Sequence, residues 1–102
     1  MHINYQDCIS LGFIRENMPE DQVWIDQHGY DFFALTLNVG GGFIFDWDIE
    51  TGVVVLTRED DSQRIVDKVE IKNINKLPIL INYFSNKEHQ TELSLITVAS
   101  DL

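Results

Sequence analysis

The sequence predicts an α+β fold: an antiparallel meander of four or five strands packed against one C-terminal helix, with a short N-terminal helix. Apolar side chains alternate with a period of two through much of residues 22–72, and glycine-rich or acidic turns separate these segments. Residues 74–84 change to helical spacings of three and four. With 102 residues and no linker rich in Pro, Gly or Ser, the chain is expected to form a single domain, residues 1–102.

The first predicted element is a helix over Tyr5 to Leu11. Asn4 is expected to cap it, and Asp7 lies in its first turn, where a carboxylate suits the helix dipole. Gly12 can adopt the left-handed conformation that ends a helix, with apolar Phe13 folding back behind it. A helix of about two turns is too short to be stable alone, so we expect it to dock against the rest of the protein.

The alternating segments follow a polar loop at residues 17–21. The predicted strands are residues 22–28, 32–39, 43–48, 53–58 and 64–72. The predicted turns are residues 29–31, the glycines at 40–42, the hairpin at 50–52 and the acidic turn at 59–62. The fourth segment is apolar on both faces, which indicates a strand that is central or covered on both sides. In the last strand, Ile65, Val69 and Ile71 are expected to face the core.

The C-terminal helix is predicted from an apolar stripe that would cover the sheet. Asn73 is expected to cap it, and Pro78 is tolerable because it lies near the first turn. The stripe consists of Ile74, Leu77, Leu80, Ile81 and Phe84. Residues 88–102 leave three interpretations open: a strand, a helix or a flexible tail. Leu93, Leu95, Ile96 and Val98 would form a strand that pairs with the sheet edge or with another copy.

Charge is distributed unevenly along the chain. The net charge is −10, from 17 acidic and 7 basic residues, and residues 1–62 hold 12 of the acids against only Arg15 and Arg58. The remaining 40 residues carry five acids and five bases, so all of the excess lies in the first part. Such a field repels nucleic acid and anionic membranes and attracts basic protein surfaces. Lys68, Lys72 and Lys76 are interspersed with acids and form no basic patch, so we expect no direct nucleic-acid binding.

The cellular compartment is predicted from the single cysteine and from the N-terminal residues. The lone Cys8 cannot form an internal disulfide, and no apolar run approaches the length of a membrane span. The N-terminus lacks a basic stretch followed by an apolar one. We therefore expect a cytoplasmic protein with no membrane partner, located in the host cytosol if a phage encodes it.

Two apparent ligand-binding motifs lack the residue spacing or the following element that their ligands require. Asp46, Asp48 and Glu50 resemble the start of a calcium loop, but Gly52 comes one residue late and Thr57 stands where a bidentate Glu is needed. The glycines at 40–42 lead into a strand, whereas a phosphate loop leads into a helix. Neither pattern predicts a metal or a nucleotide.

A thiolate mechanism would pair Cys8 with a histidine. His2, His28 and His89 are the candidates, but no local signature of a catalytic cysteine accompanies Cys8, which we interpret as a small apolar residue of the core. Pairs of carboxylates fall on turns or outward strand faces, where surface charge is the simplest interpretation. We therefore expect no enzyme, no catalytic residues, no cofactor and no metal.

A mixed apolar and acidic surface remains as the candidate site. If Phe43, Phe45 and Trp47 face the C-terminal helix, the alternate residues of that strand and of residues 22–28 face the other way. An indole and an aliphatic side chain among carboxylates suit a protein interface, although cover by the N-terminal helix or the tail would explain the same residues. The predicted acidic surface consists of Trp24, Asp26, Ile44, Asp46, Asp48, Glu50, Glu59, Asp60 and Asp61.

Three groups of residues carry a resemblance to other proteins. They are Leu11, Gly12 and Phe13, the aromatic residues Phe32, Phe33, Phe43, Phe45 and Trp47, and the segment with Val69, Ile71, Asn73, Ile74, Leu77 and Leu80. The arrangement resembles a loose group of small acidic proteins from bacteriophages and mobile elements, among which Pro78 is a departure. The group shares no common activity, so the resemblance assigns no functional residue.

The function expected from these observations is a non-enzymatic inhibitor. By analogy with anti-CRISPR and other anti-defence proteins, it would occupy the basic surface of a host-defence protein that handles nucleic acid. Its carboxylates would take the places of phosphates, with Trp24 as the desolvated anchor. The alternatives are an immunity protein that neutralises a basic nuclease toxin, and a structural or assembly protein that self-associates, for example as a homodimer.

Overall fold

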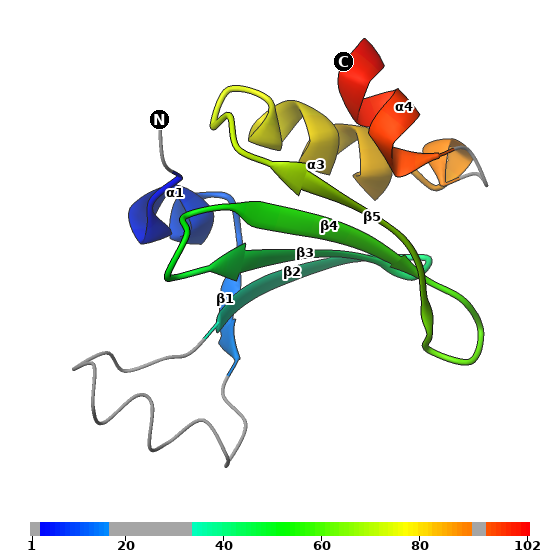
Figure 1. Cartoon of the computed structure of the whole chain (residues 1–102), viewed down its shortest axis with the longest axis horizontal. Helices are drawn as coiled ribbons and strands as arrows, with labels where there is room; N and C mark the ends of the chain where they lie inside the picture. The colour runs from blue at the N-terminus through cyan, green and yellow to red at the C-terminus, as the bar shows by residue number, and fades with distance from the viewer. Residues whose placement is uncertain (1–2, 17–33, 91–93) are drawn as a thin grey trace.

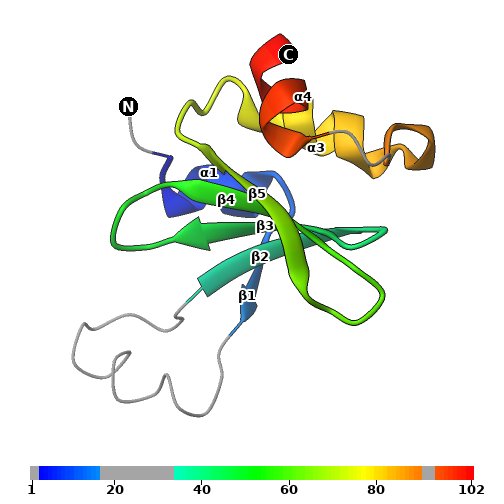
Figure 2. The same cartoon turned by 45° about the vertical axis from the view of Figure 1, so that its right-hand side comes forward.

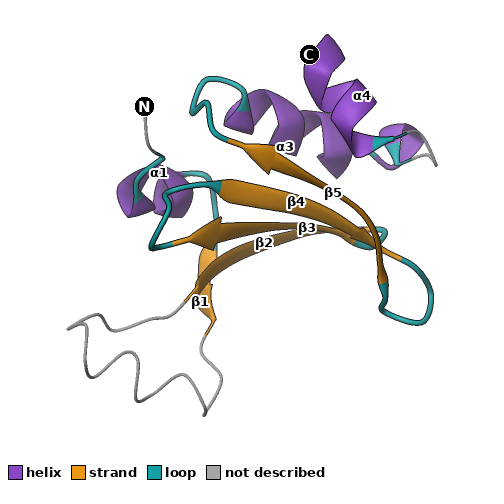
Figure 3. Cartoon of the chain, in the orientation of Figure 1, coloured by secondary structure: helices purple, strands orange, loops and turns teal. Residues whose placement is uncertain are grey.

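The computed structural model describes residues 3–16, 34–90 and 94–102 (Figure 1). An antiparallel sheet has the strand order β1-β2-β3-β4-β5, with helices packed against it, so the predicted α+β fold is confirmed (Figure 3). The strands are β1 (Ile14–Glu16), β2 (Ala34–Gly40), β3 (Phe43–Asp48), β4 (Val54–Glu59) and β5 (Ile65–Ile71). The helices are α1 (Tyr5–Ser10), α3 (Leu77–Ser85), the 3₁₀ turn η2 (Lys87–His89) and α4 (Leu95–Asp101).

The N-terminal helix is capped as predicted. The Asn4 side chain accepts a hydrogen bond from the backbone N–H of Asp7, and the Asp7 carboxylate accepts one from that of Asn4. Gly12 has a φ of +99°, and Phe13 behind it is buried. Cys8 points from α1 into the core, as its interpretation as a core residue requires.

The first strand of the observed sheet was not predicted. β1 comes directly after Phe13 and pairs with β2, Ile14 opposite Thr36. Three residues are too few to show an alternation. The predicted strand 22–28, the loop 17–21 and the turn 29–31 lie outside the described residues.

The hairpins follow the predicted turns. Gly40, Gly41 and Gly42 all have positive φ and connect β2 to β3, with a bulge between Asn38 and Gly40. At the next turn Gly52 has a φ of +69° and donates to the carbonyl of Asp48. β4 lies between β3 and β5, which confirms it as an interior strand.

The predicted inward position of Ile65 is wrong. Val69 is half-buried and Ile71 is buried, but 61% of Ile65 is exposed. The β4–β5 ladder shifts register between Arg58 and Glu59, so Ile65 is opposite Glu59 at the far end of the strand. In Figure 1 this end of β5 extends away from α3 and α4.

The C-terminal helix starts later than predicted, because Asn73 caps a turn instead. Its side chain accepts a hydrogen bond from the N–H of Asn75, and α3 begins at Leu77. This start places Pro78, which has no N–H to donate, inside the first turn. The predicted stripe faces the core: Leu77, Leu80 and Phe84 are buried, and Ile74 and Ile81 pack against them.

The tail forms a helix, so its interpretation as a strand is wrong. In α4 the buried residues are Leu95, Val98 and Ala99, whose spacing of three and one is helical. Asp67 of β5 accepts a hydrogen bond from the N–H of Leu95 at the start of α4. The ammonium of Lys76 donates to the carbonyl of Ala99 near its end. Both charges complement the helix dipole, which helps a seven-residue helix to dock.

The core lies between the sheet and the helices. Phe43, Phe45 and Trp47 alternate along β3 on its buried face, and α3 and α4 lie over the same side of the sheet (Figure 1). Phe43 stacks on Phe84 of α3, and the indole N–H of Trp47 donates to the carbonyl of Ile3 before α1. We refer to the other side of the sheet, opposite α3 and α4, as the open face.

Candidate partner-binding surface

The open face carries part of the predicted acidic surface. Ile44 and Asp46 alternate with the buried aromatic residues of β3 and are half-buried, and Asp48 is exposed. Strand alternation therefore places these three side chains as predicted. Trp24 and Asp26, the other two predicted members from strand residues, lie outside the described residues.

The sheet register arranges the open face in cross-strand rows. One row runs from Ile14 on β1 through Thr36 and Asp46 to Val55 on β4. The Thr36 hydroxyl donates to the Asp46 carboxylate over 2.6 Å, which fixes the carboxylate in the middle of the row. The next row places Ile44 between Asn38 and Thr57. Neighbours in a row are close enough to form one contact surface.

A groove joins three of the predicted residues. Ile44, Asp46 and Glu59 line it together with Ile14, of which 67% is exposed. The groove combines an exposed aliphatic side chain with two carboxylates. Such a combination suits an interface with a positively charged partner surface.

The remaining acids lie at the two ends of the sheet rather than in the groove. Asp48 and Glu50 belong to the β3–β4 hairpin, where the Asp48 carboxylate accepts the N–H of Glu50. Asp60 and Asp61 belong to the turn before β5, which lies at the opposite end because adjacent strands are antiparallel. Six residues of β4 separate the two ends, about 20 Å at 3.3 Å per residue. The predicted surface is thus a central groove with an acidic turn at each end.

Some of these carboxylates also stabilise their own turns. The Asp60 carboxylate accepts hydrogen bonds from the N–H groups of Ser62 and Arg64 and lies 3.6 Å from the Arg64 guanidinium. The Asp48 carboxylate accepts a hydrogen bond from the N–H of Glu50 within its own hairpin. The Asp46 carboxylate accepts a hydrogen bond from the Thr36 hydroxyl, and Asn at this position keeps an oxygen that can accept the same bond. Asp46→Asn and Glu59→Gln are therefore suitable variants, because they change charge while they preserve side-chain shape.

Sequence reasoning missed Ile14 as a member of the surface. It belongs to the three-residue strand β1, and nothing in its neighbourhood showed an alternating pattern. Thr36 and Asn38 were predictable, because alternation with buried Leu35 already places them on the open face.

The other candidate chemistries have structural explanations. Among the described residues, no group of three or more His, Cys, Asp or Glu could hold a metal ion. The ring of His89 stacks on Tyr83, and its Nδ1 lies 2.9 Å from the Tyr83 carbonyl. Cys8 and His89 lie at opposite ends of the molecule, on α1 and η2, and therefore do not form a thiolate pair (Figure 1). His2 and His28 lie outside the described residues.

Cys8 is poorly suited to nucleophilic chemistry. Burial, and to a smaller extent the neighbouring Asp7 carboxylate, raise the pKa of its thiol from 9.0 to about 12. The reactive species of a cysteine is the thiolate, which is therefore scarce at neutral pH in the folded protein.

The raised pKa of Cys8 predicts a loss of stability at alkaline pH. Above pH 9 the thiol ionises in the unfolded chain but stays protonated in the folded one until about pH 12. The free energy of unfolding should fall in this window by about 1.4 kcal/mol per pH unit through Cys8 alone. Urea unfolding of wild type and Cys8→Ala between pH 8 and 11 measures this contribution as the difference between their slopes. Parallel slopes would contradict it.

Comparisons with known proteins add no homologue. No family model, curated protein or solved structure matches the chain. Within the described residues, no helix is long and apolar enough to cross a membrane. The function must therefore be argued from the open face itself.

Proposed function

We propose that the chain is a non-enzymatic acidic binding protein of phage or mobile-element type. It acts in the cytoplasm by occupying the basic surface of a host-defence protein that handles nucleic acid. The observation that carries this proposal is the open-face groove, which Asp46 and Glu59 line together with Ile14 and Ile44. The concentration of the net charge of −10 in residues 1–62 supports the same function.

The inhibition is electrostatic and competitive. The carboxylates of the groove and of the acidic turns take the places of phosphates on the partner's Lys and Arg side chains. The aliphatic residues between them supply apolar contact, so binding requires more than opposite net charge. Of the described helices, α3 and α4 lie on the other side of the sheet from this groove.

The test compares two double variants with the same change in net charge. Asp46→Asn with Glu59→Gln neutralises the groove, whereas Glu88→Gln with Asp101→Asn neutralises two exposed carboxylates on η2 and α4. Tagged proteins first capture partners from host lysate at low and high salt. The captured protein is then purified, and its affinity for each variant is measured by calorimetry.

We expect a basic nucleic-acid-binding partner that is lost at high salt. The groove variant should bind it about tenfold more weakly, since each rim or partly buried charge contact contributes up to about 1 kcal/mol. The control should bind within about twofold of wild type. Equal losses for both variants, or binding that salt does not weaken, would refute the proposal. A nuclease toxin as the captured partner would instead identify an immunity protein.

A further inference from the structure

β5 is the last strand of the sheet, and its outer edge lies on the side away from β4. Among the described strands, β4 is its only partner. Figure 2 shows β5 in front of the sheet, below α4. An edge strand presents backbone N–H and C=O groups to an added strand, which makes it a template for β-sheet pairing.

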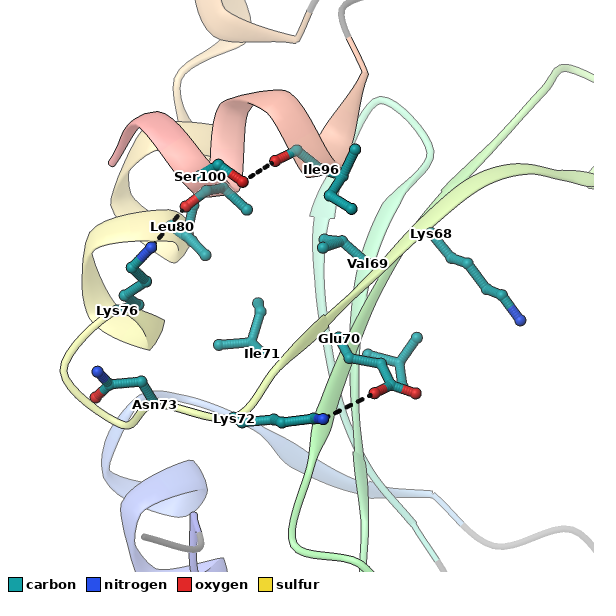
Figure 4. Close-up of a pocket in the computed structure, with 12 residues that line it drawn as sticks. Lys68, Val69, Glu70, Ile71, Lys72, Asn73, Lys76, Leu80, Ile96 and Ser100 are labelled. Carbon is teal, nitrogen blue, oxygen red and sulfur yellow. Dashed lines mark hydrogen bonds and ion pairs between the residues drawn. The ribbon is translucent and has the colours of Figure 1, made fainter.

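The side chains along this edge alternate between apolar and charged. Figure 4 shows Val69 and Ile71 directed towards the cleft between β5, α3 and α4, which Ile96 also lines. Glu70 and Lys72 point to the opposite side and lie 3.8 Å apart. Ile96 is 60% exposed although it borders a largely apolar cleft. An added strand that alternates in the same way would cover Ile96 and extend both faces of the sheet.

The charges along this edge indicate which partner strand could pair with it. Residues 67–72 carry Asp67 and Glu70 together with Lys68 and Lys72, so this edge is balanced in charge although the protein is acidic. A basic partner fits the acidic groove, not this balanced edge. The β5 strand of a second copy has both the required alternation and the required mixture of charges.

Two antiparallel registers place opposite charges face to face. One sets Glu70 opposite Lys68 of the second copy and needs the backbone N–H of Lys68, which already donates to the Asp67 carboxylate over 2.9 Å. Asp67 is held in place by its second bond, to the N–H of Leu95. The other register sets Glu70 opposite Lys72 of the second copy and leaves the Asp67 bonds intact. The intermediate register places Glu70 opposite Glu70 and is repulsive.

We propose that two copies of the chain form a dimer by antiparallel pairing of their β5 strands around a twofold axis at Ile71, with Glu70 of each copy facing Lys72 of the other. The paired backbone edge lies on β5, apart from the groove lined by Ile14, Ile44, Asp46 and Glu59, while the side chains of Glu70 and Lys72 point to the open face. The dimer goes beyond the proposed function. The paired segment is short, so the dimer is weak and forms at high protein concentration.

Sedimentation velocity over a range of about 10 to 500 µM protein tests the dimer, because weak interfaces dissociate below such concentrations. The weight-average mass of wild type should rise from 11.8 kDa towards twice that value. Glu70→Lys should weaken self-association about tenfold, since it turns two attractive cross-strand pairs into repulsive ones. The double variant Glu70→Lys, Lys72→Glu exchanges the charges and should restore it.

The matched control is Glu88→Lys, which makes the same change in net charge at an exposed site on η2. Both single variants reduce the net negative charge, so general repulsion between copies would predict stronger association for both. Circular dichroism establishes that each variant is folded. A wild type that stays monomeric throughout, equal behaviour of the two single variants, or no recovery in the double variant would overturn the proposal. Asp46 and Glu59 are unchanged in all of these variants, so failure of the dimer would leave the proposed binding at the groove standing.

Discussion

Gly42→Ala is expected to lower the free energy of unfolding by about 3 kcal/mol. Gly42 has a φ of +86°, a conformation that costs a residue with a Cβ about 1 kcal/mol or more. An added Cβ would also lie 2.5 Å from the backbone carbonyl oxygen of Glu59, which has no flexible end that can move aside. The N–H of Glu59 donates to the carbonyl of Gly42 over 2.8 Å, so any displacement also disturbs this bond between the two strands.

Gly40→Ala separates the clash from the backbone strain. Gly40 has a nearly identical φ of +89°, but nothing lies within 4 Å of the Cβ position. Its substitution should cost about 1 kcal/mol, the strain alone. Urea unfolding followed by tryptophan fluorescence measures both variants against wild type. A similar cost for the two substitutions would show that the hairpin adapts to the Cβ and that the close approach is not important.

The Gly42 contact also concerns the candidate site, because Glu59 lines the open-face groove. The backbone of Glu59 is held against Gly42 at the end of β4, which fixes the point from which its carboxylate extends. Residual folded Gly42→Ala protein should therefore bind a partner less tightly than Gly40→Ala protein. The conformational requirement of one glycine thus links the stability of the hairpin to the position of a charge.

Local signals explain the parts of the fold that could be predicted. Asn4, Asp7 and Gly12 determine both ends of α1 within a few residues of each other, so a short segment of sequence contains the whole element. The alternation in β3 likewise separates buried Phe45 from half-buried Asp46 without knowledge of the rest of the chain.

One error is local, and the other two occur where tertiary packing decides. The sequence around Asn73 offers a helix cap, but the position of Pro78 makes the helix begin at Leu77. Residues 95–99 are compatible with a strand until Leu95, Val98 and Ala99 are seen to face the core together. The position of Ile65 depends on a register shift that no local pattern signals.

The candidate surface could likewise be predicted only where a single strand determines the arrangement. Alternation correctly predicted that Ile44 and Asp46 share the open face, because this depends on one strand alone. The separation of Asp48 and Glu50 from Asp60 and Asp61 depends on which hairpin lies at which end of the sheet. The inclusion of Ile14 depends on the pairing of β1 with β2. Composition predicts the net charge, but only the strand register shows which part of the sheet carries the acidic side chains.

Phe84→Ala is expected to lower the free energy of unfolding by about 4 kcal/mol, within the range for a buried aromatic side chain replaced by alanine. Phe84 is 2% exposed and stacks on Phe43 with ring centroids 5.0 Å apart, so it directly connects α3 to β3. Its backbone carbonyl accepts a hydrogen bond from Gln90, and this bond survives the substitution. The expected loss is therefore that of side-chain packing.

Ile79→Ala is the control on the same helix. Ile79 is 48% exposed, so its truncation should cost less than about 1 kcal/mol. Thermal and urea unfolding of both variants measure the difference, and a small loss for Phe84→Ala would contradict the packing of α3 on the sheet. The open-face variant Asp46→Asn with Glu59→Gln should behave like Ile79→Ala in stability while losing partner affinity. Since α3 packs on one side of the sheet and the groove lies on the other, substitutions can then affect folding and binding separately.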